Sequence, residues 1–303
     1  MRKLIIYILL IIPVFAAKGQ MPQLSQYMLN SFYINPAIAG TYNEYIVKAS
    51  FRYQWIGFGP EAPNTLNVSL FGPHEEYNMG YGGYFYSDNT GPTSRNGIMG
   101  SYAYNIQIGL DYRLSMGLSA GLMQYSIDGS NIILGDQNDP VLFTNAPIYL
   151  PDMNIGAYFY SNNMHVGISS HQLLGNDVKD VFEYTEDSLE HINKLKRHVY
   201  LMGGYMFILD RDWSVEPSAI ITYSYAQPLQ FEISCRAIYL KSIWAGLSWR
   251  TGDKLSTFSL LTSYKHERKY EFGISYDVNI SKVDNFGFGS VEVLLGYWFD
   301  KIK

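Results

Sequence analysis

Apolar and polar residues alternate along most of this chain with a period of two. In the first such segment, residues 45–55, every odd position is apolar, and the even positions from 48 to 54 are polar or charged. Successive side chains of a β-strand point to opposite faces, so this pattern predicts a strand with one apolar face and one polar face. Val47 and Phe51 belong to the apolar face, while Lys48, Ser50 and Arg52 belong to the polar one.

The same alternation recurs along the rest of the chain. The further segments are residues 66–70, 79–86, 98–106, 112–122, 155–159, 164–168, 199–207, 215–225, 231–237, 243–249, 255–264, 270–278 and 291–299. Most of them are close to the roughly 9–11 residues with which a tilted strand crosses a bilayer. The sequence therefore predicts an all-β protein, a transmembrane antiparallel β-barrel of about 14 strands, with a range of about 12 to 16.

The lengths of the connections test this strand count. In an outer-membrane barrel whose chain starts in the periplasm, even-numbered connections are periplasmic and short, and the long loops are extracellular. Three tight connections, residues 161–163, 210–212 and 240–242, fall at even positions. The two longest, 126–152 and 174–196, fall at odd positions, so we expect both on the outer side of the membrane.

The N-terminus has the features of an export signal. Arg2 and Lys3 precede an apolar stretch over residues 4–17, and Ala17 and Gly19 stand three and one residues before a plausible cleavage ahead of Gln20. No later run reaches the roughly 18 apolar residues that a transmembrane helix needs. We predict a signal peptide over 1–19, a lead segment over 20–42 that folds into the barrel, and the barrel itself over 43–303.

Composition favours the membrane over a soluble alternative. Aromatic residues make up 16% of the chain and charged residues also only 16%, against about a quarter in ordinary soluble domains. A large secreted β-sandwich would show the same alternation, but it would need a charged solvent face. Aromatic residues near the strand ends are typical of interfacial girdles; they lie at 53/55, 84–86, 158–160 and 297–299.

Charge and cysteine content exclude other classes of function. The formal net charge is −5, and Arg2, Lys3 and Lys18 lie in the predicted signal, so the mature chain is more acidic still. Nucleic acid is therefore not expected as a partner. The single cysteine, Cys235, has no disulfide partner, and we interpret it as a small packing residue.

The chain offers few residues with the spacing of a catalytic or metal site. His165 and Ser169 lie four apart on one predicted strand, roughly 13 Å from each other, which is too far for a catalytic pair. We interpret them, with His171, as part of a polar lumen face. Asp136, Asn138 and Asp139 carry oxygen ligands suited to Ca²⁺ but lack the EF-hand spacing. The sequence thus predicts no enzyme activity and no cofactor.

The polar faces of the strands predict a charged lumen. Gly80, Gly82 and Gly83 alternate with tyrosines inside one segment, where they would let the sheet curve or let a plug approach closely. Charges of both signs inside a barrel pair with one another or line a binding channel. Ser50 lies on the same polar face, and its replacement should be mild. The lumen candidates are Lys48, Arg52, Arg113, Glu232, Arg236, Arg250, Glu271, Asp277 and Glu292.

A succession of short motifs carries a family resemblance. Its motif residues are Gln26, Tyr27, Asn35, Pro36, Gly40, Arg52, Gln54, Trp55, Pro63, Asp88, Gly91 and Pro92. In order and spacing these motifs, with 102–104, 151–160 and 290–293, resemble the PorP/SprF family of type IX secretion system outer-membrane proteins of the Bacteroidota. The resemblance extends over essentially the whole mature chain. Asn35-Pro36 also has a local meaning, because it initiates a turn in the lead segment.

The resemblance implies both a cellular location and a function. It implies a non-enzymatic barrel in the cell outer membrane that contacts lipid and other type IX components. Such a barrel would support secretion and surface anchoring of cargo that carries a C-terminal sorting domain, including gliding adhesins, with its long loops facing the cargo. The alternative is a general porin or small-solute transporter. The two differ in the lumen, which an anchor should have plugged and a porin open.

Overall fold

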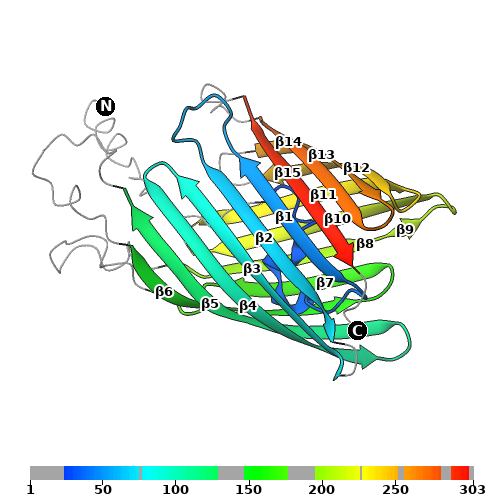
Figure 1. Ribbon diagram of the computed structural model, residues 1–303. Helices are drawn as coiled ribbons and strands as arrows, with labels where there is room; N and C mark the ends of the chain where they lie inside the picture. Colours follow the sequence, from blue (N-terminus) through cyan, green and yellow to red (C-terminus); the bar gives the residue numbers. More distant parts are fainter. Residues whose placement is uncertain are drawn as a thin grey trace, which may run out of the picture.

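The computed structural model describes residues 24–74, 77–128, 147–176, 195–225, 227–251, 256–280 and 288–299, and strands dominate these residues (Figure 1). Two short helical segments precede the strands. The elements are α2 (Ser31–Ile34), η1 (Pro36–Ile38), β1 (Tyr45–Tyr53), β2 (Asn64–His74), β3 (Met79–Thr90), β4 (Thr93–Ile108), β5 (Tyr112–Ile127), β6 (Ile148–Tyr160), β7 (Met164–His171), β8 (His198–Tyr205), β9 (Phe207–Ile208), β10 (Trp213–Ser224), β11 (Gln227–Tyr239), β12 (Ile243–Thr251), β13 (Ser256–His266), β14 (Tyr270–Asn279) and β15 (Ser290–Phe299).

The strands form one closed antiparallel sheet. Each pairs with its neighbours in the sequence, and β1 also pairs with β15, with Tyr45 opposite Phe299, which closes the barrel. Figure 1 shows β1 in blue beside β15 in red. The short β9 continues β8 after a break at Met206, since both pair with β10. Counted this way the barrel has 14 strands, which confirms the predicted count.

The strand connections define two rims. The turn rim carries residues 77–78, 109–111, 161–163, 209–212, 240–242 and 267–269, together with the start of β1 and the end of β15. Two of its turns place two consecutive non-glycine residues at positive φ: Leu240 and Lys241 in one, Glu267 and Arg268 in the other. Consecutive left-handed residues give the twist that a tight hairpin between right-twisted strands needs.

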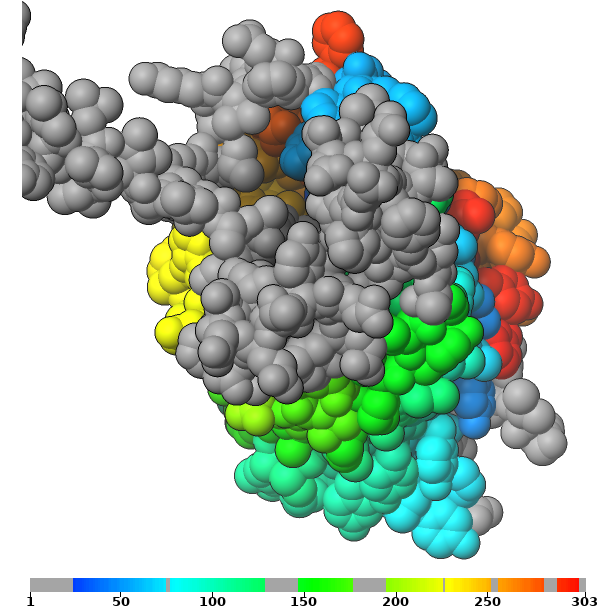
Figure 2. Space-filling model, turned by 90° about the vertical axis from the view of Figure 1, so that its left-hand side faces the viewer, coloured from blue at the N-terminus to red at the C-terminus, as the bar shows by residue number. Residues whose placement is uncertain are grey.

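The loop rim is the opposite end, where β1, β3, β5, β7, β10, β12 and β14 end and β2, β4, β6, β8, β11, β13 and β15 begin. Figure 2 views the molecule from the left of Figure 1, where green residues of β6 and β7 and yellow residues of β10 and β11 reach the surface. The predicted tight connections at 161–163, 210–212 and 240–242 share the turn rim, and both long connections start from the loop rim. This confirms the parity expected from the connection lengths.

Side chains alternate between the two faces of the wall as predicted. On β1, Phe51 is 48% exposed and points outward, whereas Ser50 is 1% exposed and points into the lumen. The exterior is apolar, with Leu70 and Leu295 about as exposed as Phe51. Ser50 is buried in the lumen, and the expectation that its replacement is mild stays a prediction.

Aromatic pairs across neighbouring strands mark the turn rim. The ring centroids of Tyr45 and Phe299 lie 5.6 Å apart, those of Tyr112 and Phe159 5.4 Å, and those of Trp213 and Tyr239 4.7 Å. A belt of this kind suits the interface between lipid and water. Among the aromatic residues assigned to a girdle, 84, 86, 158 and 160 instead face the lumen, because they occupy the inward parity of their strands.

Two further features concern the exterior and the helices. Cys235 lies on the outer face of β11 and is exposed, so its interpretation as a packing residue was wrong. None of the helices in the described parts of the chain is long and apolar enough to cross a membrane.

The exterior face predicts a directional response to charge. Leu295 lies at the middle of β15 opposite Ala49, and its side chain is 51% exposed. Replacement Leu295→Arg should lower the free energy of unfolding by about 2–4 kcal/mol, the cost of a cation at the bilayer midplane. Denaturant titration in liposomes measures it, with Leu295→Met as the near-neutral control. Equal destabilisation by both variants would contradict a lipid-facing Leu295.

Candidate functional site

The N-terminal segment fills the barrel. Residues 24–42, which we call the plug, lie inside the wall and appear in dark blue in Figure 1. Phe32 and Ile38 are 1% exposed, and Asn30 and Asn35 are fully buried. The plug starts in the loop-rim half of the lumen, where Leu24 contacts Arg250 of β12, and reaches the turn rim before β1 begins. The lumen is therefore occupied by the chain itself.

Asn35 and Pro36 shape the middle of the plug. The Asn35 side chain accepts a hydrogen bond from the Ala37 amide at 3.0 Å and so caps η1, whose first residue is Pro36. A proline suits the first helical position because its missing N–H would have no partner there. The Asn35 amide group also donates to the carbonyls of Ala157 and Ile168, at 3.0 and 3.3 Å. One side chain thus fixes both the turn and its attachment to β6 and β7.

Glycines in the wall let the plug backbone come close. A Cβ at Gly80 would lie 1.9 Å from the Ala39 oxygen, and a Cβ at Gly117 would lie 2.3 Å from the Ala37 nitrogen. Gly82 likewise faces Phe32, whereas Gly83 faces the backbone of β4. The predicted role of this glycine cluster in the approach of a plug is confirmed for Gly80 and Gly82, because no larger residue fits there.

A buried ion network holds the start of the plug. Arg52 lies 2.6 Å from an Asp277 carboxylate oxygen and 3.5 Å from one of Glu292, and all three side chains are nearly inaccessible. Ser25 completes the network: its amide donates to Glu292 at 2.7 Å, its hydroxyl donates to Asp277 at 2.6 Å, and Arg52 donates to that hydroxyl. The neighbouring Gln26 donates to the Glu292 carbonyl at 2.9 Å.

Two more cations of the wall bind plug carbonyls. Arg250 donates to the Leu24 oxygen at 3.3 Å while it pairs with Glu232 at 2.6 Å. Lys48 donates to the Leu29 oxygen and lies 3.7 Å from Glu271. Buried carbonyls need a hydrogen-bond partner, and for Leu24 and Leu29 donors of the wall supply it.

The predicted lumen residues all form ion pairs inside the barrel, with the exception of Arg113. All except Arg113 are buried or partly buried on inward faces and form ion pairs, with Arg236 paired to Glu216 at 2.7 Å. Arg113 is exposed at the turn-rim end of β5. Glu216 was missed by sequence reasoning, although counting back from the β10–β11 hairpin places it opposite Arg236.

The polar residues of β7 bind the plug and do not form a catalytic pair. Ser169 donates to the Ile34 carbonyl at 2.7 Å, and the His171 ring nitrogen Nε2 lies 2.6 Å from the same oxygen. Both side chains are inward and buried, which confirms their interpretation as lumen-face residues. Asn30 adds a bond of 2.8 Å to Asn67 of β2, and Gly40 accepts one of 3.2 Å from Asn105 of β4.

Aromatic side chains pack the plug against β2 and β3. Phe32 stacks on Phe71 with ring centroids 4.4 Å apart, and Tyr33 meets Tyr84 edge to face at 5.1 Å. Tyr27 reaches the opposite wall, where its hydroxyl lies 3.0 Å from the Ser218 hydroxyl and 3.2 Å from that of Ser234. The plug is therefore bonded on both sides of the lumen.

The remaining motif residues gather at the loop rim. The Gln54 amide donates to Pro63 at 2.8 Å, and the Trp55 amide donates to Ser290 at 3.3 Å. Asp88 accepts from Thr65 at 2.7 Å. Gly91 donates to Glu61 at 3.2 Å, and the Pro92 carbonyl accepts from Asp128 at 2.8 Å, so the first outer loop is tied to the next turns.

The described residues hold no group of three or more His, Cys, Asp or Glu side chains placed to bind a metal ion. Asp136, Asn138 and Asp139 lie outside the described residues.

Comparison with known proteins gives a family and a fold. Residues 16–297 match the family model of the type IX secretion system membrane protein PorP/SprF. No curated protein matches the chain.

Solved structures with the same fold are outer-membrane barrels of very different sequence. They include the Ralstonia pickettii toluene transporter TbuX, with 7% identity and a TM-score of 0.54 over 90% of this chain and 93% of that one. A Pseudomonas aeruginosa FadL homologue has 10% identity and a TM-score of 0.51 over 88% and 92%. The P. putida toluene transporter TodX has 6% identity and a TM-score of 0.51 over 89% and 93%. At these identities the likeness concerns the fold alone.

The ion network makes Arg52 the residue on which the start of the plug depends. Replacement Arg52→Met leaves the Asp277 and Glu292 carboxylates buried without their nearest cation, and it should lower the free energy of unfolding by about 3–5 kcal/mol. Denaturant titration measures the loss, and limited proteolysis should release the N-terminal segment sooner. Arg113→Met, at an exposed site, should change stability by less than about 0.5 kcal/mol.

The carboxylates offer the complementary test. Adding Asp277→Asn and Glu292→Gln to Arg52→Met removes the uncompensated charge and should recover part of the loss. A triple variant less stable than Arg52→Met alone would contradict the charge argument.

Proposed function

Because the chain belongs to the PorP/SprF family of type IX secretion system membrane proteins, we propose that this outer-membrane barrel supports secretion and surface anchoring of cargo carrying a C-terminal sorting domain. Cargo of the gliding-adhesin type is the kind we expect. The observation that carries this proposal beyond family membership is the filled lumen. A segment bonded to the wall at both ends and in the middle occupies the lumen, which supports an anchor over a general porin.

The wall also gives a reason to expect binding of protein and not catalysis. Its charged side chains pair with each other or with plug carbonyls, so the described lumen offers no reactive group aimed at a substrate. Family and structural relatives are secretion or channel proteins of the membrane and not enzymes. We therefore place the interaction with cargo and with other type IX components at the rims.

The loop rim is the surface we assign to cargo. It carries both long connections and the tied motif residues of 54–63 and 91–92, and it should face the cell exterior because the short turns lie at the other end. Lipid contacts the apolar exterior. The alternative of a porin or small-solute transporter matches the names of some structural relatives, but 6–10% identity transfers no substrate.

Deleting the gene separates the anchor from the porin. We expect a subset of exported proteins with C-terminal sorting domains to be lost from the cell surface while uptake of small nutrients stays normal. Surface labelling with mass spectrometry measures the first effect, and growth on limiting sugars or amino acids measures the second. Correct display of every sorted protein together with slower uptake would decide for the porin.

Shortening the first long connection tests the assigned surface. Since β5 ends at Ile127 and β6 begins at Ile148, residues 129–146 can be replaced by a short Gly-Ser linker without cutting a strand. Part of the display defect should follow while the barrel still inserts, as judged by the gel shift between heated and unheated samples. The control inserts the same Gly-Ser linker at Asn162, on the turn rim, and should leave display of cargo at the cell surface intact.

A further inference from the structure

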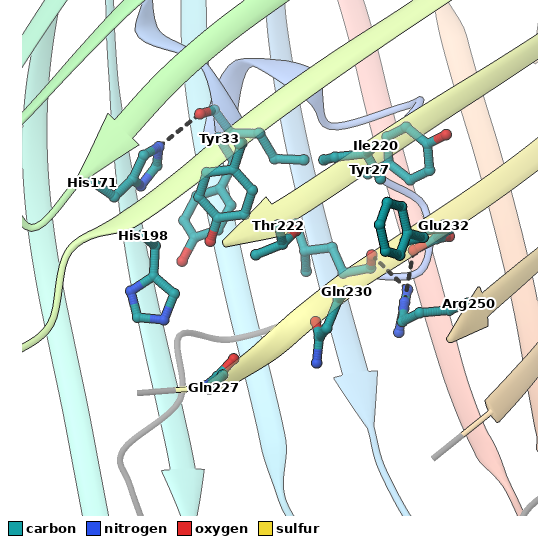
Figure 3. A pocket seen from close by; sticks show the side chains of 14 residues that line it. Tyr27, Tyr33, His171, His198, Ile220, Thr222, Gln227, Gln230, Glu232 and Arg250 are labelled. Atoms are coloured by element: carbon teal, nitrogen blue, oxygen red, sulfur yellow. Dashed lines mark hydrogen bonds and ion pairs between the residues drawn. The ribbon is translucent and has the colours of Figure 1, made fainter. Parts of the chain in front are cut away.

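The plug leaves two pockets along one side of the lumen. The outer pocket lies toward the loop rim, where Thr222, Gln227 and Gln230 of β10 and β11 line it (Figure 3). The inner pocket reaches the turn rim at Ser161–Asn163 and also holds His165. The outer pocket extends over β7, β8, β10, β11 and β12, and the inner pocket extends over β6, β7, β8, β10 and β11.

Tyr27 stands between these pockets and lines both of them. Its side chain is 2% exposed, and its hydroxyl bonds to Ser218 and Ser234 on the facing strands. Figure 3 shows Tyr27 at the deep end of the outer pocket, away from Gln227. The phenol ring therefore spans the gap between the plug and the wall at this level.

The inward face of the wall carries small side chains where Tyr27 contacts it. Five neighbouring strands contribute only small residues to one register row, each opposite the next, namely Gly204, Ser218, Ser234, Ser248 and Ser259. These small side chains leave a space beside the plug, which the Tyr27 ring fills while its hydroxyl bonds to Ser218 and Ser234. Met28 contributes a single further contact, its sulfur lying 3.2 Å from the Ser218 hydroxyl.

The adjacent rows are polar and balanced in charge. Two residues toward the loop rim, Glu232 pairs with Arg250, and two residues toward the turn rim, Glu216 pairs with Arg236. Each pair lines the pocket on its own side of Tyr27. A path through this level would present hydroxyls and ion pairs without net charge. Such a lining suits hydrated ions of either sign and small neutral solutes.

We propose that Tyr27 is the gate of a closed pathway for small polar solutes, which runs along β10, β11 and β12 between the outer and inner pockets. In the described state the ring closes it. Displacement of Tyr27 joins the pockets into a polar channel one side chain wide. This pathway is separate from the cargo role, which depends on the rims.

The test compares four forms of the mature full-length barrel in planar bilayers with potassium chloride as the probe. Wild type should conduct little. Tyr27→Ala should raise the single-molecule conductance at least tenfold, while Tyr27→Phe should stay closed because the ring remains. Phe32→Ala is the matched control: Phe32 is as deeply buried in the plug, but it stacks on Phe71 and lines neither pocket.

Two outcomes overturn the proposal. In the first, Tyr27→Ala stays as closed as wild type; in the second, Phe32→Ala opens the barrel as far as Tyr27→Ala does. The first result would mean that the pockets do not join at Tyr27, and the second that any weakened plug leaks. Swelling of liposomes in L-arabinose gives the same comparison for a neutral solute.

A chemical rescue keeps the test valid if Tyr27→Ala folds poorly. In a Cys235→Ser background, Tyr27→Cys should conduct, and benzyl methanethiosulfonate should restore closure by placing a ring at position 27. Dithiothreitol should then reopen the same molecules by removing it. Conductance that does not respond to this cycle would place the gate elsewhere.

Discussion

An irregular segment inside a membrane barrel must find a partner for every buried backbone group, and the rest of this structure depends on that requirement. Only helices and closed barrels satisfy their own backbone at membrane depth, and other conformations persist there only when surrounding protein supplies donors and acceptors. Turns and two short helical segments of the plug supply partners for some of its carbonyls, such as those of Gln26 and Ser31, and the wall supplies partners for others. Arg250, Lys48 and Asn105 each donate to one of them.

The same requirement explains why charges lie in the lumen. Removing ions from water is costly, and a buried pair repays this only with good geometry and further hydrogen bonds. Arg52 faces two carboxylates, and the Ser25 amide and hydroxyl supply additional donors to them. The network is therefore complete only when the plug is in place. This couples the fold of the N-terminal segment to strands at the opposite end of the sequence.

Small residues on the inner face set how closely the plug can approach. Gly80 and Gly117 admit its backbone directly, and the serines of β10, β11 and β12 leave space that Tyr27 fills. The plug backbone packs directly on wall glycines on one side of the lumen, and the Tyr27 ring bridges the plug and the wall on the other. The lumen is therefore closed. The rims of the barrel are then the surfaces free for other proteins, which agrees with a role in a secretion machine better than with an open pore.

The sequence by itself determined the barrel. Alternation with a period of two is a local property of each strand, so the faces, the strand count and the rim that carries the long connections follow from residues read a few at a time. The glycines at 80 and 82 further predicted either a curved sheet or the close approach of a plug. Aromatic character misled at positions 84, 86, 158 and 160, which have the inward parity, because aromatic residues suit a lipid girdle and a packed lumen equally well.

Only the tertiary structure decided what the inward faces bind. The partners of Ser25 are Glu292 and Asp277, more than two hundred residues away in the chain, and no local pattern pairs them. Arg113 shares the inward parity of the buried charges, yet its place at the turn rim leaves it in water. Tyr27 carries no signal of its own position either. Its role depends on where an irregular segment crosses the lumen, and that path is fixed by contacts distributed over the whole barrel wall.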